Sequence, residues 1–347
     1  MPKKCSLSRL NSRRRHSASI FVGMTVGLVV VMLLVGNASA DTWAEKLGYP
    51  SGKRVLMLHA DDIGMCYEAN HAAKEYLTAG AIQSAAMMVP CPWFNEFAAW
   101  VKENPGHCVG LHLAMNSEWK FYRWGPVAPR SEVPSMLDRE GYLWHDTPQT
   151  MLQGKAVEIE REVRAQVERA LAAGVKPTHI DTHMGTLYAR PDFTAAFFRV
   201  AVEYRIPANA LEPTPRIIEK FRKRGIPKTA ELESLLKNYP LPKLDDFDSV
   251  PNGKTYEEKL ENFFNLVRSF EPGITEIIFH PSIETEGLKR ITGSWQQRVW
   301  EARMFSDPAV QRFFEREEIV FTNWKQVMER WEERFGHNVP KPQELAK

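Results

Sequence analysis

The chain has 347 residues, with 45 basic and 43 acidic side chains and an ordinary globular composition. This length is too great for a marginal core, and the composition shows no low-complexity tract. The first forty residues carry six bases and no acid, so the remainder holds 39 basic against 43 acidic residues, a net charge of −4. Because this remainder is mildly acidic, it lacks the basic footprint of a nucleic-acid-binding protein, and we expect no nucleic-acid partner.

The N-terminal segment has the features of a secretory signal. Basic residues precede a nearly unbroken apolar run from Ile20 to Val35, and Ala38 and Ala40 are the small residues of a signal-peptidase site. We expect residues 1–40 to be removed, leaving a periplasmic or extracellular protein without a stable membrane span. The alternative is an uncleaved anchor helix, because the apolar run is near the lower limit for crossing a bilayer.

Beyond the signal, apolar β-rich segments alternate with helical patterns. Strands are predicted at 54–60, 81–89, 108–115, 177–184, 274–281 and 318–323, and helices at 66–80, 92–106, 155–174, 191–206 and 256–270. Repeated strand–helix order predicts a parallel sheet covered by helices. An open doubly wound sheet and a (β/α) barrel both satisfy this order. No glycine-rich phosphate loop follows the first strand, and acids stand at its end instead, so the pattern alone leaves both the open sheet and the TIM-like barrel as candidates.

One domain at 41–335 accounts for these elements. The proline-rich and charged region at about 207–256 is predicted to be an irregular insertion around short helices, and residues 336–347 to be a C-terminal tail. The sequence leaves the oligomeric state open, with a dimer among the options.

Chemically active residues gather at the predicted strand ends. Asp61, Asp62, His112, His183 and His280 all lie at or near the carboxyl end of a strand, where barrels carry their catalytic groups. Imidazole and carboxylate are common ligands for a divalent metal ion, and three such ligands with an open position make a hydrolytic site. The pattern therefore predicts a metal-dependent hydrolase. At the end of its strand, His280 is placed to protonate a leaving group or to polarise an oxyanion.

The segment "THIDTH" places three polar residues on one face of a strand. His179 and His183 are roughly 13 Å apart along an extended strand, so they do not bind the same ion. His183, nearest the carboxyl end, is the ligand candidate, and His179 and Asp181 are expected deeper, as support or as a buried hydrogen-bonded pair.

Adjacent acids in "HADDIGM" point to opposite sides of a strand and can take different roles. One can bind the metal while the other acts as a base, although a polar strand end or a helix N-cap is the simpler reading. His59 shares the face of Asp61 two residues deeper and is expected to support the site. His112 stands among small residues, which leaves room for a ligand, although a core histidine is an alternative.

Aromatic residues cluster in the loop that follows the predicted strand of His112. Trp119 and Trp124 in "NSEWKFYRWGP" suit the apolar faces of sugar rings and are candidate substrate-binding residues. A loop packed on its own aromatic rings is the alternative.

Four motifs, "HADDIGM", "VGLHLAM", "PTHIDTHMG" and "EIIFHPS", resemble the YdjC/ChbG-like carbohydrate deacetylases in order and spacing. The resemblance covers about 53–327, apart from 207–256. It implies a distorted (β/α) barrel, one divalent ion, magnesium or zinc, and removal of acetyl groups from N-acetylated sugars. Carried over by motif, Asp62, His112 and His183 are the metal ligands, Asp61 is the general base and His280 is the acid.

Three positions depart from the family pattern. Met184, Gly185 and Thr186 follow His183 where further histidines are common, and Ile63 replaces a phenylalanine. The fifth-strand segment has no arginine before Arg216, which becomes the candidate substrate-binding arginine. Two other functions stay open: a metal hydrolase of another ester or phosphoester bond, and a catalytically inactive carbohydrate-binding barrel.

Overall fold

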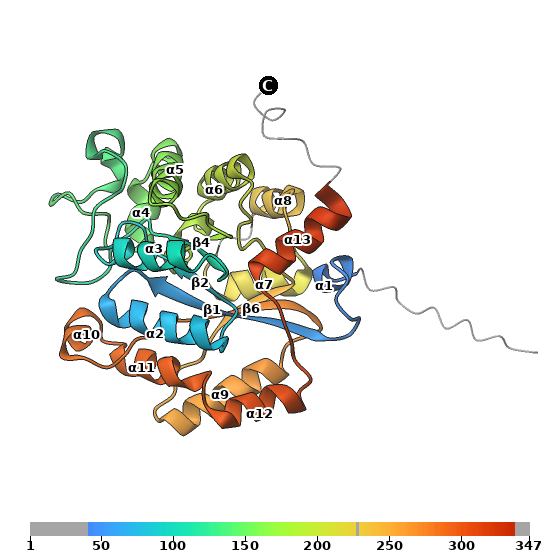
Figure 1. The fold of residues 1–347 in the computed structure, drawn as a ribbon. Helices are drawn as coiled ribbons and strands as arrows, with labels where there is room; N and C mark the ends of the chain where they lie inside the picture. The colour runs from blue at the N-terminus through green and yellow to red at the C-terminus, as the bar shows by residue number, and fades with distance from the viewer. Residues whose placement is uncertain (1–40, 227–228, 337–347) are drawn as a thin grey trace, which may run out of the picture. The chain divides into compact units, whose positions relative to one another are not determined.

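The computed structural model describes residues 41–226 and 229–336 (Figure 1). The expected signal at 1–40 and almost all of the expected tail lie outside the described residues. None of the helices in the described part combines the length and the apolar character that a membrane span needs.

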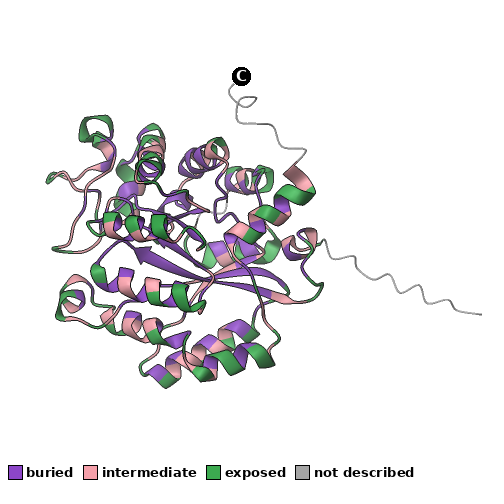
Figure 2. Ribbon diagram, in the orientation of Figure 1, coloured by how far each residue is buried: buried purple, intermediate pink, exposed green. Residues whose placement is uncertain are grey.

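A parallel sheet forms the centre of the fold. Its order is β4-β3-β2-β1-β6-β5, and β7 pairs with the start of β1. The strands are β1 (Arg54–Ile63), β2 (Ser84–Met87), β3 (Val109–Leu113), β4 (Ile180–Thr182), β5 (Asp246–Ser249), β6 (Gly273–Phe279) and β7 (Val320–Phe321). Strands β1 to β4 and β6 are almost entirely buried, as expected for parallel strands covered by helices, whereas β5 and β7 are partly exposed (Figure 2). The predicted distorted (β/α) barrel is confirmed.

The region predicted as an insertion behaves differently: it completes the sheet. The backbone of Ile180 in β4 exchanges hydrogen bonds with Pro207 and Asn209, at 2.9 and 3.1 Å. Leu244, just before β5, bonds in the same way to Ala210 and Glu212, at 2.9 and 3.0 Å. Residues 207–212 therefore connect the two edge strands. This strand and β5 were missed because both are short, and prolines and acids interrupt the apolar pattern that marks a buried strand.

Helices surround the sheet (Figure 1). The longest, α5, buries Ile159, Val163, Val167 and Ala170 at the spacing of one helix face. The α-helices are α1 (Trp43–Lys46), α2 (Tyr67–Ala79), α3 (Phe94–Glu103), α4 (Thr147–Gln153), α5 (Ala156–Ala172), α6 (Pro191–Tyr204), α7 (Pro215–Lys223), α8 (Ala230–Asn238), α9 (Tyr256–Arg268), α10 (Glu286–Ile291), α11 (Trp295–Met304), α12 (Pro308–Arg316) and α13 (Trp324–Phe335). Short 3₁₀ turns are η1 (Arg130–Glu132), η2 (Pro134–Met136) and η3 (His183–Tyr188).

Close packing between β3 and the start of β4 depends on Gly110. A Cβ atom at this position would overlap the carbonyl oxygen of His179 and lie 2.5 Å from its ring. We expect Gly110→Ala to lower the free energy of unfolding by about 1–3 kcal/mol, because backbone and a buried ring must move. Urea denaturation measures this loss. Gly106→Ala is the control, because no neighbouring atom lies within 4 Å of the position that its Cβ would take. An equal loss of unfolding free energy in both variants would contradict the packing argument.

Candidate active site

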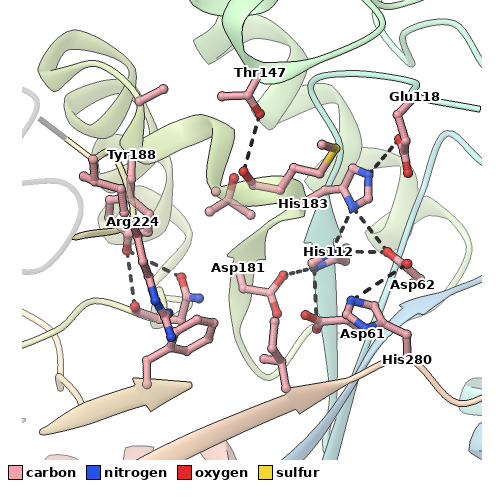
Figure 3. A pocket seen from close by; sticks show the side chains of 18 of the residues that line it. Asp61, Asp62, His112, Glu118, Thr147, Asp181, His183, Tyr188, Arg224 and His280 are labelled. Carbon is pink, nitrogen blue, oxygen red and sulfur yellow. Dashed lines mark hydrogen bonds and ion pairs between the residues drawn. The ribbon is translucent and has the colours of Figure 1, made fainter. Parts of the chain in front are cut away.

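The carboxyl ends of four strands meet at one cavity of about 590 Å³ (Figure 3). Asp61 and Asp62 come from β1, His112 from β3, and Asp181 and His183 from the end of β4. These five side chains are buried, while His280, which follows β6, is partly exposed at the cavity wall. The structure therefore brings together the predicted strand-end residues.

Two of these strand ends have an unusual backbone. The pairing of β1 with β2 shifts register between Ala60 and Ile63, and Asp62 has a left-handed φ of 61°. Met184, directly after His183, also has a positive φ, 52°. Such conformations cost about 1–3 kcal/mol each at non-glycine residues and persist only where the surroundings hold them. The distortion lets both adjacent acids reach the cavity, which a regular strand would prevent.

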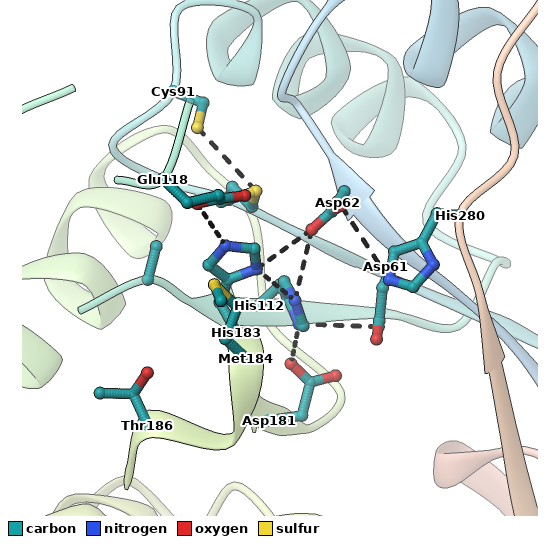
Figure 4. Close-up of polar contacts among 12 residues, drawn as sticks. Asp61, Asp62, Cys91, His112, Glu118, Asp181, His183, Met184, Thr186 and His280 are labelled. Carbon is teal, nitrogen blue, oxygen red and sulfur yellow. Dashed lines mark hydrogen bonds and ion pairs between the residues drawn. The ribbon is translucent and has the colours of Figure 1, made fainter. Parts of the chain in front are cut away.

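Three potential ligand atoms form a compact triangle (Figure 4). His112 Nε2 lies 3.1 Å from His183 Nδ1, and Asp62 Oδ1 lies 3.2 Å from His183 Nδ1 and 3.5 Å from His112 Nε2. Asp62 Oδ1 is buried and makes no hydrogen bond of regular geometry. Ligands bound about 2.0–2.2 Å from one divalent ion lie about 3 Å from one another. The triangle, hereafter the Asp–His–His triad, thus has the donor types and spacing that fit one divalent ion.

Carboxylates orient both imidazole rings of the triad. Asp181 Oδ1 accepts a hydrogen bond from His112 Nδ1 at 2.6 Å, and Glu118 Oε2 accepts one from His183 Nε2 at 3.0 Å. With those nitrogens as donors, the two facing nitrogens carry lone pairs toward each other. A cation or a proton must lie between them, and carboxylate-oriented histidine is a common arrangement around metals.

Charge in the triad favours a cation. Burial lowers the pKa of His183, but Glu118 and Asp62 outweigh it and raise the pKa to about 10, so that a proton occupies the site when no metal does. Burial raises the pKa of Asp62, but Arg298, His280 and His183 hold it well below its ordinary value. Arg298 donates to Asp62 Oδ2 at 2.7 Å, and His280 Nε2 is 4.0 Å from the same oxygen. Asp62 therefore stays ionised despite its burial.

A second polar layer lies beneath the triad. His59 Nε2 is 3.0 Å from Asp181 and 3.1 Å from Asp61, and its Nδ1 is 2.6 Å from Ser84 Oγ and 3.5 Å from Glu276. Burial lowers the pKa of His59, but Glu276, Asp181 and Asp61 raise it well above its ordinary value. His59 therefore links Asp61 to the carboxylate that orients His112.

His179 lies apart from the cavity. Its Nδ1 is 2.9 Å from Thr178 Oγ1, and its ring stacks on Trp324 with centroids 5.6 Å apart. Burial and the neighbouring His59 hold its pKa well below its ordinary value, so the ring is neutral. His179 is a buried packing residue rather than part of the cavity wall.

The substrate-binding candidates are placed differently from one another. Trp119 lines the cavity, whereas Trp124 is only 3% exposed and packs behind Trp119 and His183. Arg216 does not line the cavity, because it pairs with Asp246 elsewhere on the surface. Arg216 was assigned to substrate binding only from its position in the chain. In the structure, Arg224 at the C-terminal end of α7 lines the cavity instead.

Three charged lining residues were not assigned from sequence: Glu118, Arg224 and Arg298. Glu118 is a single acid within an aromatic loop, and Arg298 is 236 residues away from the Asp62 that it contacts. No local pattern marked Glu118 or Arg224.

Comparisons with known proteins identify the family of this chain. The family model described as YdjC-like protein matches residues 55–316. The carbohydrate deacetylase of Thermus thermophilus is 32% identical, over 82% of this chain and 97% of that protein. The carbohydrate deacetylase of Thermoanaerobacter pseudethanolicus is 27% identical, over 78% of this chain and 98% of that protein.

A solved structure shares the fold. It is a protein from Enterococcus faecalis V583, described as a cellobiose-phosphate cleavage protein, with a TM-score of 0.66 and 22% identity over 80% of this chain and all of that one. This likeness concerns the fold alone. The family match spans about three quarters of the chain and includes the triad and His280. The chain is therefore a member of the YdjC-like family.

Proposed function

We propose that this protein is a metal-dependent deacetylase that hydrolyses the acetamide of N-acetylated sugars. The observation that carries the proposal is the Asp–His–His triad in the cavity, since its two imidazole nitrogens and one carboxylate oxygen have the types and spacing of ligands for one divalent ion. The names of the relatives, carbohydrate deacetylases, support an acetylated sugar as substrate. Trp119 in the cavity wall offers an aromatic face for a sugar ring.

Asp62, His112 and His183 would hold the ion. A divalent ion there polarises the acetamide carbonyl and makes water more acidic. Two imidazole ligands favour zinc over magnesium, which prefers oxygen ligands. Asp181 and Glu118 accept hydrogen bonds from the opposite ring nitrogens, so in the neutral imidazoles the proton lies there and the lone pair of the ligating nitrogen faces the site.

Asp61 and His280 divide the proton transfers. Asp61 lines the cavity next to the triad and takes the proton of the attacking water, while His59 at 3.1 Å steadies its carboxylate. His280 delivers a proton to the departing amine. Burial lowers the pKa of His280, Asp62 partly offsets this, and Arg298 lowers the pKa further, so its imidazolium form gives up a proton more readily than a free imidazolium.

Acetate release from N-acetylglucosamine oligomers tests the reaction. With zinc or magnesium present, we expect turnover by the wild type and a loss of at least about 100-fold in kcat for Asp61→Asn, because the base is removed. Leu152→Asn, an exposed change on α4, is the control. If activity survived in both Asp61→Asn and His183→Ala, the mechanism would be abandoned.

Metal content tests the ligand set independently of turnover. Elemental analysis after dialysis should find about one equivalent of zinc in the wild type and none in His183→Ala. Glu118→Gln should weaken metal affinity by about 10–100-fold, since it removes the carboxylate that orients His183. His145→Ala, an exposed histidine outside the cavity, should bind as the wild type does. Full metal retention in His183→Ala would assign the ion to other ligands.

Export is a further part of the proposal. Cleavage after Ala40 would leave Asp41 at the N-terminus, and α1 would keep its contacts, in which the backbone N–H groups of Trp43 and Ala44 donate to Asp245. We expect N-terminal sequencing of protein from the periplasm or medium to begin at Asp41. Ala40→Asp should accumulate the precursor. Intact chains found only in the cytoplasm would argue against export.

A further inference from the structure

The cavity of the triad has two ends of different chemistry. Tyr188 and Arg224 lie on the side opposite His183 and Asp62 (Figure 3). The walls of that side are largely apolar. We call the apolar lining that runs from this end toward the triad the apolar arm; Tyr188, Leu211, Phe221 and Phe247 line it far from the triad, and Met184 lines it beside His183 (Figure 4). These residues come from η3, the closing segment 207–212, α7 and β5.

Polar groups in the apolar arm are already engaged with one another. The Tyr188 hydroxyl lies 3.2 Å from the carbonyl oxygen and 3.4 Å from the side-chain oxygen of Asn209, to which it donates. Arg224 pairs with Asp248 and lies over the ring of Phe247, 5.7 Å from its centroid. A sugar carries a hydroxyl on most of its carbons, and a buried hydroxyl without a partner costs free energy. An apolar group therefore suits this arm better than a sugar ring.

Met184 adds an unusual apolar surface next to the triad. Its side chain is 50% exposed and its backbone is left-handed, with φ 52°, directly after the ligand His183. Its side chain lines the cavity, and its sulfur accepts a hydrogen bond from the Asn116 amide at 2.9 Å. Methionine is flexible and polarisable, so it can follow the shape of an alkyl chain.

A second, polar cavity adjoins the site. It has a volume of about 420 Å³ and shares His280, Ser294 and Arg298 with the first cavity. Its other walls include Asp248, Ser249, Asn252, Gln297 and Glu301. Trp119 lines the first cavity and lies under Arg298, with the guanidinium carbon 5.8 Å from the ring centroid. Hydroxyl-rich groups find hydrogen-bond partners in this second cavity.

We propose that this deacetylase also accepts, and prefers, amino sugars whose N-acyl chain is longer than acetyl, with the chain in the apolar arm and the sugar toward the polar cavity. The inference rests on the proposed function and names its substrate class. Water adds its oxygen to the acyl carbon, the C–N bond breaks, and a proton passes to the nitrogen. The products are a short-chain carboxylic acid and the free amino sugar.

A chain-length series tests this assignment with the metal-loaded enzyme. The substrates are one glucosamine disaccharide bearing N-acetyl, N-butanoyl, N-hexanoyl or N-octanoyl groups. We expect kcat/KM to rise about tenfold or more from acetyl to hexanoyl, because each buried methylene adds to binding in the transition state. A maximum at acetyl, with falling values for longer chains, would overturn the inference and leave the proposed deacetylase intact.

Binding measurements decide the case without turnover. Calorimetry with the metal-loaded Asp61→Asn variant compares the N-acetyl and N-hexanoyl disaccharides. Tighter binding of the hexanoyl compound, by about tenfold, supports the apolar arm as an acyl site even if neither compound is hydrolysed. Equal or weaker binding overturns it. If the wild type hydrolyses no substrate of the series, the proposed function is contradicted. The ratio of the N-hexanoyl to the N-acetyl affinity, measured with Asp61→Asn, tests the acyl site separately.

Met184→Asn probes the arm directly. Asparagine tolerates a left-handed backbone, so the change removes apolar surface without adding strain. We expect the hexanoyl-to-acetyl ratio of kcat/KM to fall at least threefold. Leu152→Asn is the matched control, because it removes an exposed apolar side chain away from the cavity and should leave the ratio unchanged. An unchanged ratio in Met184→Asn would remove Met184 from the acyl site.

Discussion

The carboxylate of Asp62 is the interaction on which the rest of the site depends. One of its oxygens faces the two imidazoles of His112 and His183, and the other accepts from Arg298. A buried carboxylate is costly, and a left-handed backbone at a non-glycine residue adds to that cost. His112, His183 and Arg298 contact this carboxylate and offset both costs. Through these contacts Asp62 links the carboxyl ends of β1, β3 and β4 to α11.

Charges around this carboxylate alternate in layers. Arg298 and the imidazoles surround Asp62, Glu118 and Asp181 sit behind the imidazoles, and His59 lies behind Asp181. Glu276 follows His59, and burial, together with Asp181, raises the pKa of Glu276 to about 7 although His59 opposes this. Each group therefore has an opposite charge or a donor beside it. Such a stack keeps a charged site in the middle of a barrel without leaving an isolated buried charge.

The irregular parts of the barrel supply the features that distinguish the cavity. The closing segment 207–212 contributes Leu211, and α7 and β5 contribute Phe221 and Phe247. These elements lack the long apolar runs of the central strands. Their side chains face the cavity and leave an apolar surface beside a polar catalytic centre. Loops and edge elements of a rigid scaffold commonly carry such specificity.

Much of the fold followed from local pattern. Apolar runs of strand length, separated by helical segments with glycine and proline stops, predicted six strands of the parallel sheet. The same pattern put Asp61, Asp62, His112, His183 and His280 at strand ends. Because the carboxyl ends of parallel strands share one edge of a sheet, residues far apart in the chain were expected to meet there. The family motifs added the ligand set but did not locate the carboxylates behind the imidazoles.

Tertiary structure alone decided what depends on contacts between distant segments. It selected Arg298 and Arg224 for the cavity and paired Arg216 with Asp246, because the direction of a side chain depends on how its helix packs. It also brought two short segments of the predicted insertion, 207–212 and β5, into the sheet beside the short helices α7 and α8. These segments have too few residues for the alternating pattern of a strand to be visible in the sequence. By itself, the sequence determined which residues stand at the ends of regular strands. Packing across the barrel determined which of them face one another, because those distances are not a local property of the chain.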